Sequence, residues 1–106
     1  MSTTPEGRVK KLVKDLLAEY PDLYQYWPVP AGFGPSSLDC IVCYRGQFIG
    51  IETKAPGKKP TARQDHCIAQ MVAAGGKTYV VDSAAALQPL REYLTLCRLS
   101  SVLVIS

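Results

Sequence analysis

The sequence predicts a small α/β domain in which a mixed β-sheet is flanked by helices, with the element order α-β-β-β-α-β-α-β. Three observations favour this class. A β-hairpin is expected over residues 38–54, where two apolar, β-branched runs flank a two-residue turn ending in glycine. Apolar residues recur at helical spacing before and after this hairpin. A strand, helix and second strand over residues 47–81 are typical of parallel neighbours joined by a crossover helix.

The first helix is expected to begin near Thr3, because Thr3 and Glu6 have capping-box spacing and Pro5 suits a first turn. Pro21 ends it. Its apolar face consists of Val9, Leu12, Val13, Leu16, Leu17 and Tyr20. Glu6 lies three residues before Val9 and extends this face. It either caps the helix, which the spacing favours, or reaches the sheet as an acidic group.

Residues 21–37 are rich in aromatic residues, proline and glycine. The segment from Tyr24 to Val29 is expected to form an edge strand. Pro28 and Pro30 have no N–H group to donate to a neighbouring strand, which restricts the segment to the edge of a sheet. Its aromatic side chains are more typical of core packing than of a base-stacking surface. The glycines that follow form a loop leading to the hairpin.

The register of the hairpin brings charged residues together. If Arg45-Gly46 is the turn, Asp39 faces Glu52 across the two strands. Alternation along a strand puts Lys54 on the same face as Glu52. Two carboxylates and one ammonium group therefore converge at one end of an otherwise apolar hairpin.

Opposed carboxylates destabilise a sheet unless something offsets their repulsion. A shared proton is one solution, and a hard divalent cation bound by oxygen ligands is another. Mg²⁺ commonly uses one or two carboxylates together with substrate phosphate. Lys54 would then be placed to assist a water molecule or to neutralise a phosphate in the transition state.

A second helix is expected from Thr61 and Gln64, which have capping-box spacing, to the helix-stopping Gly75-Gly76. The residues expected to share its inward face are Ile68, Met71, Val72 and Gly75. A short buried strand is expected at Lys77–Val81.

The pair Asp82-Ser83 then opens a further helical stretch, interrupted early by Pro89. Its expected inward residues are Leu87, Leu90, Leu94 and Cys97. A last short strand is expected over residues 102–105.

Composition is that of one folded soluble domain covering residues 1–106, with 47% hydrophobic and 20% charged residues. The net charge of +3 is mild. However, Lys54, Lys58, Lys59 and Arg63 occur in a run without an acidic residue. Such a run suits a phosphate backbone, although a solvated basic loop remains an alternative.

No apolar run is long enough to span a bilayer, and no signal peptide is visible, so we expect no membrane partner and a cytoplasmic location. The chain has four cysteines. Cys40 and Cys43 mimic zinc-ligand spacing, but residues three apart on a strand point to opposite faces. We therefore expect buried free thiols rather than a zinc site.

The arrangement of Asp39, twelve intervening residues and then Glu52-Thr53-Lys54 resembles the PD-(D/E)xK nuclease superfamily. A longer pattern is more specific. The segments 34–39 and 48–60, followed by Gln64, look like the virus-type replication–repair nuclease (VRR-NUC) domain, and this resemblance covers residues 6–82. One departure is Leu38, which stands where the family usually has proline before the aspartate.

This resemblance implies a restriction-endonuclease-like core and a metal-dependent endonuclease activity, with Mg²⁺ as cofactor and Mn²⁺ as a possible substitute. The implied metal ligands are Glu6, Asp39, Glu52 and the backbone carbonyl of Thr53. The implied catalytic residues are Asp39, Glu52, Lys54 and Gln64, with Lys54 serving the attacking water. Lys58, Lys59 and Arg63 are expected to hold DNA phosphates without reading base sequence.

The expected function is therefore a structure-specific DNA endonuclease that hydrolyses phosphodiester bonds in branched DNA such as Holliday junctions, in DNA repair. Free-standing phage-type members of the family are similar in size and are expected to act as homodimers. A phage-encoded protein would work in the host cell cytoplasm. The alternative is a catalytically inactive DNA-binding or assembly module of the same fold.

Overall fold

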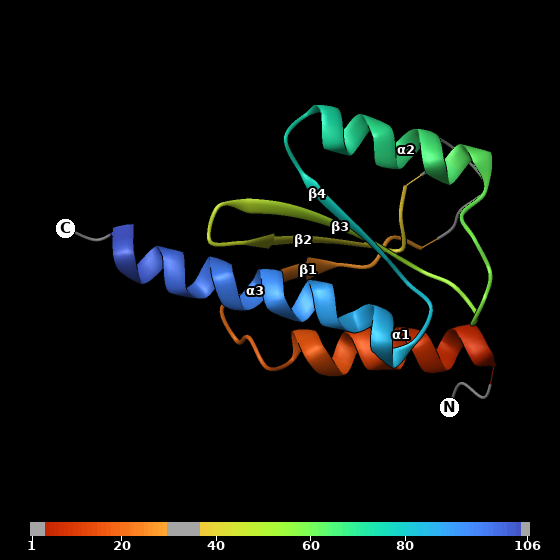
Figure 1. The fold of residues 1–106 in the computed structure, drawn as a ribbon, viewed down its shortest axis with the longest axis horizontal. Coiled ribbons are helices and arrows are strands. Elements are labelled where there is room, and N and C mark those ends of the chain that lie inside the picture. The colour runs from red at the N-terminus through yellow and green to blue at the C-terminus, as the bar shows by residue number, and fades with distance from the viewer. Residues whose placement is uncertain (1–3, 30–36, 105–106) are drawn as a thin grey trace.

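The computed structural model of the chain describes residues 4–29 and 37–104. Within these ranges the fold is mixed α/β, with three helices and one four-stranded sheet (Figure 1). The elements, in order, are α1 (Pro5–Leu17), β1 (Tyr24–Tyr26), β2 (Cys40–Tyr44), β3 (Gln47–Thr53), α2 (Ala62–Ala73), β4 (Lys77–Val81) and α3 (Ala84–Val104). These are the first seven elements that the sequence predicts, in the predicted order.

The sheet has the strand order β1-β2-β3-β4. The pairs β1/β2 and β2/β3 are antiparallel, whereas β3 and β4 are parallel neighbours. Both the predicted edge position of β1 and the predicted parallel pairing of β3 with β4 are therefore confirmed. In Figure 1, α1 and α3 lie on one side of the sheet and α2 lies on the other.

The hairpin has the predicted register, with Cys40 opposite Ile51 and Tyr44 opposite Gln47. Its turn is formed by Arg45 and Gly46, which both have positive φ angles, of 52° and 79°. Two consecutive positive φ angles are typical of the tight turn whose twist matches that of the flanking strands. This turn fixes the register along the whole hairpin and so determines what meets at its far end.

The main core lies between the sheet and the layer of α1 and α3. Alternate side chains of β2 and β3 point into this core, and the side chains between them point toward α2. The two helices contribute one apolar stripe each. Its buried members from α3 are the four predicted ones, Leu87, Leu90, Leu94 and Cys97. This packing buries most of β3, which lies between β2 and β4 in the sheet.

Helix α2 covers the opposite face of the sheet at β3 and β4. A Cβ atom on Gly50 of β3 would lie 2.7 Å from the Met71 sulfur, so the absence of a side chain lets α2 approach closely. The capping box at its start is present as predicted, with Thr61 accepting from the Gln64 N–H group. Val72, however, is exposed rather than inward, because only a narrow stripe of this short helix contacts the sheet.

Three further predictions near the chain ends are corrected. Thr4 rather than Thr3 caps α1, because the residue before Pro5 is disfavoured in helical conformation and so forms the cap. Pro89 lies inside α3 instead of interrupting it, since the buried stripe continues beyond it. The predicted last strand is wrong for residues 102–104, which continue α3 and so satisfy their backbone hydrogen bonds locally. Residue 105 lies outside the described residues.

The exposure of two side-chain classes also differs from expectation. Tyr24 and Tyr26 of the aromatic segment are exposed, whereas Trp27 packs against the core as expected. All four cysteines are free, as predicted, but Cys43 is exposed rather than buried, because α2 does not extend over β2. In the part of the chain that the structure describes, no helix combines the length and apolar character needed to cross a membrane.

Candidate functional site

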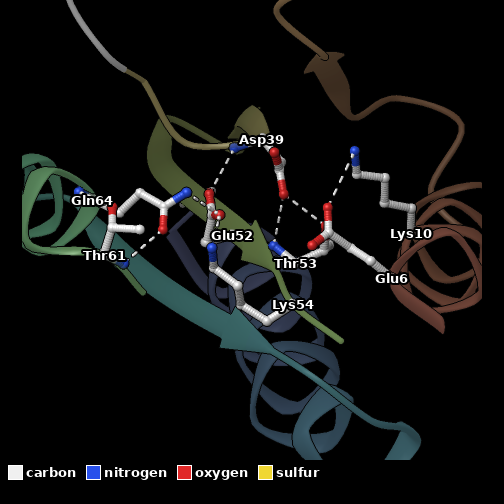
Figure 2. Close-up of polar contacts among 8 residues, drawn as sticks. All are labelled: Glu6, Lys10, Asp39, Glu52, Thr53, Lys54, Thr61 and Gln64. Carbon is white, nitrogen blue, oxygen red and sulfur yellow. Dashed lines mark hydrogen bonds and ion pairs between the residues drawn. The ribbon is translucent and has the colours of Figure 1, made fainter. Parts of the chain in front are cut away.

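Asp39 and Glu52 meet at the end of the hairpin that lies away from its turn (Figure 2). The last ladder pair joins Cys40 to Ile51, with Asp39 directly before Cys40 and Glu52 directly after Ile51. The Asp39 main-chain N–H group donates to Glu52 Oε1 over 3.2 Å. The acids predicted to face one another are thus side by side.

Thr53 fixes the orientation of Asp39. Its main-chain N–H group donates to Asp39 Oδ2 over 2.9 Å, and its hydroxyl donates to the same oxygen over 2.6 Å. Thr53 is itself fully buried, so this double contact is held by the core. Both bonds use Oδ2, so the other carboxylate oxygen of Asp39 is left to coordinate a cation.

Glu52 is a buried acid, with only 2% of its surface exposed. Its pKa is raised to about 7, first because burial disfavours the charged form and second because the Asp39 carboxylate is close. The Lys54 ammonium and the Asp39 N–H group partly oppose this rise. Near neutral pH the carboxyl therefore exchanges readily between its protonated and charged forms, and an added positive charge would favour the charged form.

Lys54 and Gln64 approach the same oxygen of Glu52. The Lys54 ammonium lies 3.5 Å from Glu52 Oε2 and its side chain is mostly buried. Gln64 Nε2 donates to Oε2 over 2.6 Å. A buried acid, a lysine and an amide from a neighbouring helix therefore form one polar cluster (Figure 2).

The capping box of α2 explains why Gln64 is so well aligned. Gln64 Oε1 accepts from the Thr61 N–H group over 2.9 Å, so the amide oxygen is used by the helix start and the amide nitrogen is left for Glu52. The helix N-terminus also carries partial positive charge, which suits an anion. One residue thus joins a local helix signal to the site.

Glu6 lies on α1 and forms an ion pair with Lys10 over 3.8 Å, with its side chain partly exposed. Among the described residues, no group of three or more His, Cys, Asp or Glu side chains is arranged to hold a metal ion. The structure therefore does not gather Glu6 with Asp39 and Glu52 into such a group. The role of Glu6 as a ligand stays a prediction.

Lys58, Lys59 and Arg63 are exposed beside the cluster, the lysines in the loop after β3 and Arg63 in the first turn of α2. Sequence reasoning missed the residue that holds this loop. Asp82, directly after β4, accepts from the Gly57 N–H group over 3.2 Å. The signal was present, because the carboxyl ends of the parallel strands β3 and β4 meet at one edge.

The donor set at the cluster fits a hard divalent cation. Asp39 and Glu52 supply carboxylate oxygens, the Thr53 carbonyl is adjacent in sequence, and no soft ligand is needed. Burial and the nearby Asp39 disfavour the charged form of Glu52 and so raise its pKa. A bound cation would favour the charged form and lower this pKa again. The sequence predicted a role only for the carbonyl of Thr53. In the structure its hydroxyl and N–H group also bind Asp39, which is a second feature that the sequence did not reveal.

Comparison of the sequence with protein-family models finds no model that matches this chain. Comparison with curated proteins likewise finds no match. The geometry of the cluster and the residue pattern around it are therefore the basis for a functional proposal.

Proposed function

We propose that this chain is a metal-dependent, structure-specific DNA endonuclease that hydrolyses phosphodiester bonds. The single observation that carries this is a buried Glu52 held against Asp39, with the Lys54 ammonium on the same oxygen as an orienting amide. In this proposal residues 1–106 form one domain similar to VRR-NUC, with the restriction-endonuclease-like core of the PD-(D/E)xK superfamily.

The chain's own residues would divide the work as follows. Thr53 fixes Asp39 Oδ2, and Gln64 fixes Glu52 Oε2. The other Asp39 oxygen, Glu52 Oε1, which also accepts from the Asp39 N–H group, and the Thr53 carbonyl would hold Mg²⁺ or Mn²⁺. Such an ion, when bound, polarises phosphate oxygens and lowers the pKa of water. Lys54 would orient the attacking water and place positive charge beside the attacked phosphate.

Binding is assigned to the exposed basic residues around the cluster. Lys58, Lys59 and Arg63 would contact backbone phosphates, which gives affinity without sequence preference. Branched DNA such as a Holliday junction is the proposed substrate, cut by a homodimer because one site cuts one strand. DNA repair or phage replication in the host cytoplasm would be the setting.

The test is cleavage of labelled single strand, duplex, flap, splayed arm and four-way junction, in Mg²⁺ and in EDTA. We expect cutting of branched substrates in Mg²⁺ alone, and none by Glu52→Gln. Asp15→Asn is the matched control, because Asp15 is an exposed acid paired with Lys11 on the surface of α1. Cleavage by Glu52→Gln at the wild-type rate would refute the assignment.

A second function is favoured by one specific feature. Glu52 already accepts hydrogen bonds from Gln64 and Asp39 and pairs with Lys54, so the cluster is satisfied without a cation. This suits a catalytically inactive DNA-binding or assembly module. Calorimetric titration with Mg²⁺ and Mn²⁺ separates the two functions. A nuclease should show a binding heat that is lost in Glu52→Gln, whereas an inactive module should show no such heat.

A further inference from the structure

Strand β1 exposes two aromatic rings on the surface of the sheet. Tyr24 is 64% exposed and Tyr26 is 55% exposed. Trp27 instead packs against the core, with the Lys14 ammonium 4.8 Å from its ring centre. Both tyrosines of β1 are therefore exposed, whereas the aromatic residue directly after the strand packs inward.

The two tyrosines lie on the face of the sheet that carries the acid pair. Tyr26 is opposite Ile41, which is opposite Gly50, and Gly50 approaches Met71 of α2. Glu52 is two residues beyond Gly50 on β3 and therefore shares that face, as its bond to Gln64 confirms. The row of residues that begins with Tyr26 consequently lies next to the row that contains the Asp39–Glu52 cluster.

In Figure 1, helix α2 lies over β3 and β4, and among the described residues it does not reach β1. At the cluster end, the exposed basic groups of Lys58, Lys59 and Arg63 are available for phosphates. Near the tyrosines, the acid Asp22 is neutralised by Arg45 at 2.6 Å. Exposed aromatic rings on the face of the cluster, together with exposed basic groups in the segment after β3, match single-stranded nucleic acid, whose bases stack while its phosphates pair with cations.

We propose that Tyr24 and Tyr26 form a base-stacking surface for unpaired nucleotides of the DNA strand whose phosphate enters the Asp39–Glu52 cluster. This rests on the proposed nuclease function and deepens it, because it assigns the substrate an unpaired segment beside the cut. The surface selects for unpaired bases, since bases inside a duplex have no free face to offer a side chain.

The test compares two fluorescein-labelled oligonucleotides of equal length, an oligothymidylate and an abasic strand with the same phosphates. Anisotropy is measured with Ca²⁺ in place of Mg²⁺. We expect Tyr24→Ala and Tyr26→Ala each to weaken oligothymidylate binding roughly tenfold and to leave abasic-strand binding unchanged. Tyr24→Phe and Tyr26→Phe should retain binding, because the ring remains. Equal effects on both oligonucleotides would overturn the proposal.

Leu96→Ala is the matched control, because Leu96 is a similarly exposed apolar residue on α3, away from this face. It should bind both strands like the wild type. Sedimentation of the same variants tests the competing occupant, a second copy of this chain. If the alanine variants lose a dimer and the weaker binding follows that dissociation, the tyrosines are an interface between copies and the proposal is wrong.

Failure of this proposal is distinct from failure of the nuclease function. Base-dependent binding lost in the tyrosine variants, with no cleavage by the wild type, would support the stacking surface and refute the nuclease. Metal-dependent cleavage with no preference for oligothymidylate over the abasic strand would support the nuclease and refute the stacking surface.

Discussion

Glu52 is the residue whose charge state couples the cluster to the stability of the fold. Its pKa in the folded chain is about 7, against an ordinary value of 4.5. The folded state therefore holds a proton that the unfolded state releases. The contribution of this group to the free energy of unfolding is fully present at pH values below 4.5, and it is lost as the pH rises through about 7.

We predict that, without divalent metal, the free energy of unfolding falls across this pH window by about 3 kcal/mol, since one pKa unit corresponds to about 1.4 kcal/mol. Asp39, Lys54 and Gln64 face the group and set the size of the change. Urea unfolding at several pH values measures it. Glu52→Gln, which cannot ionise, should flatten the profile, and an unchanged slope in that variant would contradict the prediction.

Lys54 is the residue at which binding and chemistry should separate. Removal of the ammonium in Lys54→Met should lower kcat by at least about a hundredfold, a loss typical of one charge-stabilising group. DNA affinity should change little, because other basic residues hold the phosphates. Lys59→Met is the matched control, since that exposed loop lysine should affect affinity and its salt dependence but not kcat. Equal kcat losses in both variants would argue against the assignment.

At the scale of elements, α2 and β3 depend on each other through a single missing side chain. A methyl group on Gly50 would meet the Met71 sulfur at 2.7 Å and a Leu38 methyl at 3.1 Å. The Met71 and Leu38 side chains would have to shift, and any outward movement of α2 that follows would carry Gln64 with it.

We predict that Gly50→Ala lowers the free energy of unfolding by about 1–3 kcal/mol, the usual cost of overpacking. The loss should shrink in a Met71→Ala background, where the methyl group has room, and a double-mutant cycle from urea melts measures this coupling. Cleavage should decline together with stability where α2 shifts, because the amide that orients Glu52 lies on this helix. Additive effects of the two substitutions would show that the close approach is not the cause.

The elements also show which parts of the fold a sequence can specify. The hairpin register was predictable, because only one register buries both Val42 and Ile49 and uses Arg45-Gly46 as the turn. The start of α2 was predictable from its capping box, which is local. The outward tyrosines were not, since the exposure of an edge strand depends on how far α2 extends across the sheet. The Asp82–Gly57 bond likewise joins residues distant in sequence.

At the scale of the whole molecule, the cluster sits between the sheet and α2. Strand β3 brings Glu52 and Thr53, the approach to β2 brings Asp39, and α2 brings Gln64, while α1 and α3 bury the other face of the sheet (Figures 1 and 2). Any ion bound there contacts groups that are adjacent only in the folded chain. Metal binding must therefore stabilise folding as a whole.

We predict that saturating Mg²⁺ raises the free energy of unfolding by a few kcal/mol, about 2.7 kcal/mol at a hundred times the dissociation constant. The gain should be larger above the Glu52 pKa of about 7 than below it, because the ion competes with the proton. Thermal melts with and without Mg²⁺ measure it. A gain that persists in Glu52→Gln would place the ion elsewhere.

The same melts decide the role of Glu6, which α1 holds beside Lys10 instead of in the acid pair. If Glu6 completes the ligand set when the ion binds, Glu6→Gln should weaken the Mg²⁺ response and leave the metal-free stability nearly unchanged. If Glu6 serves only the helix start, where an acid interacts favourably with the N-terminal partial charge, the variant should lose about 0.3–1 kcal/mol with or without Mg²⁺. Glu19→Gln, an exposed acid beyond the end of the same helix, is the control for a general effect of surface charge. The dependence of the loss on Mg²⁺, rather than its size, is therefore what separates a ligand from a cap.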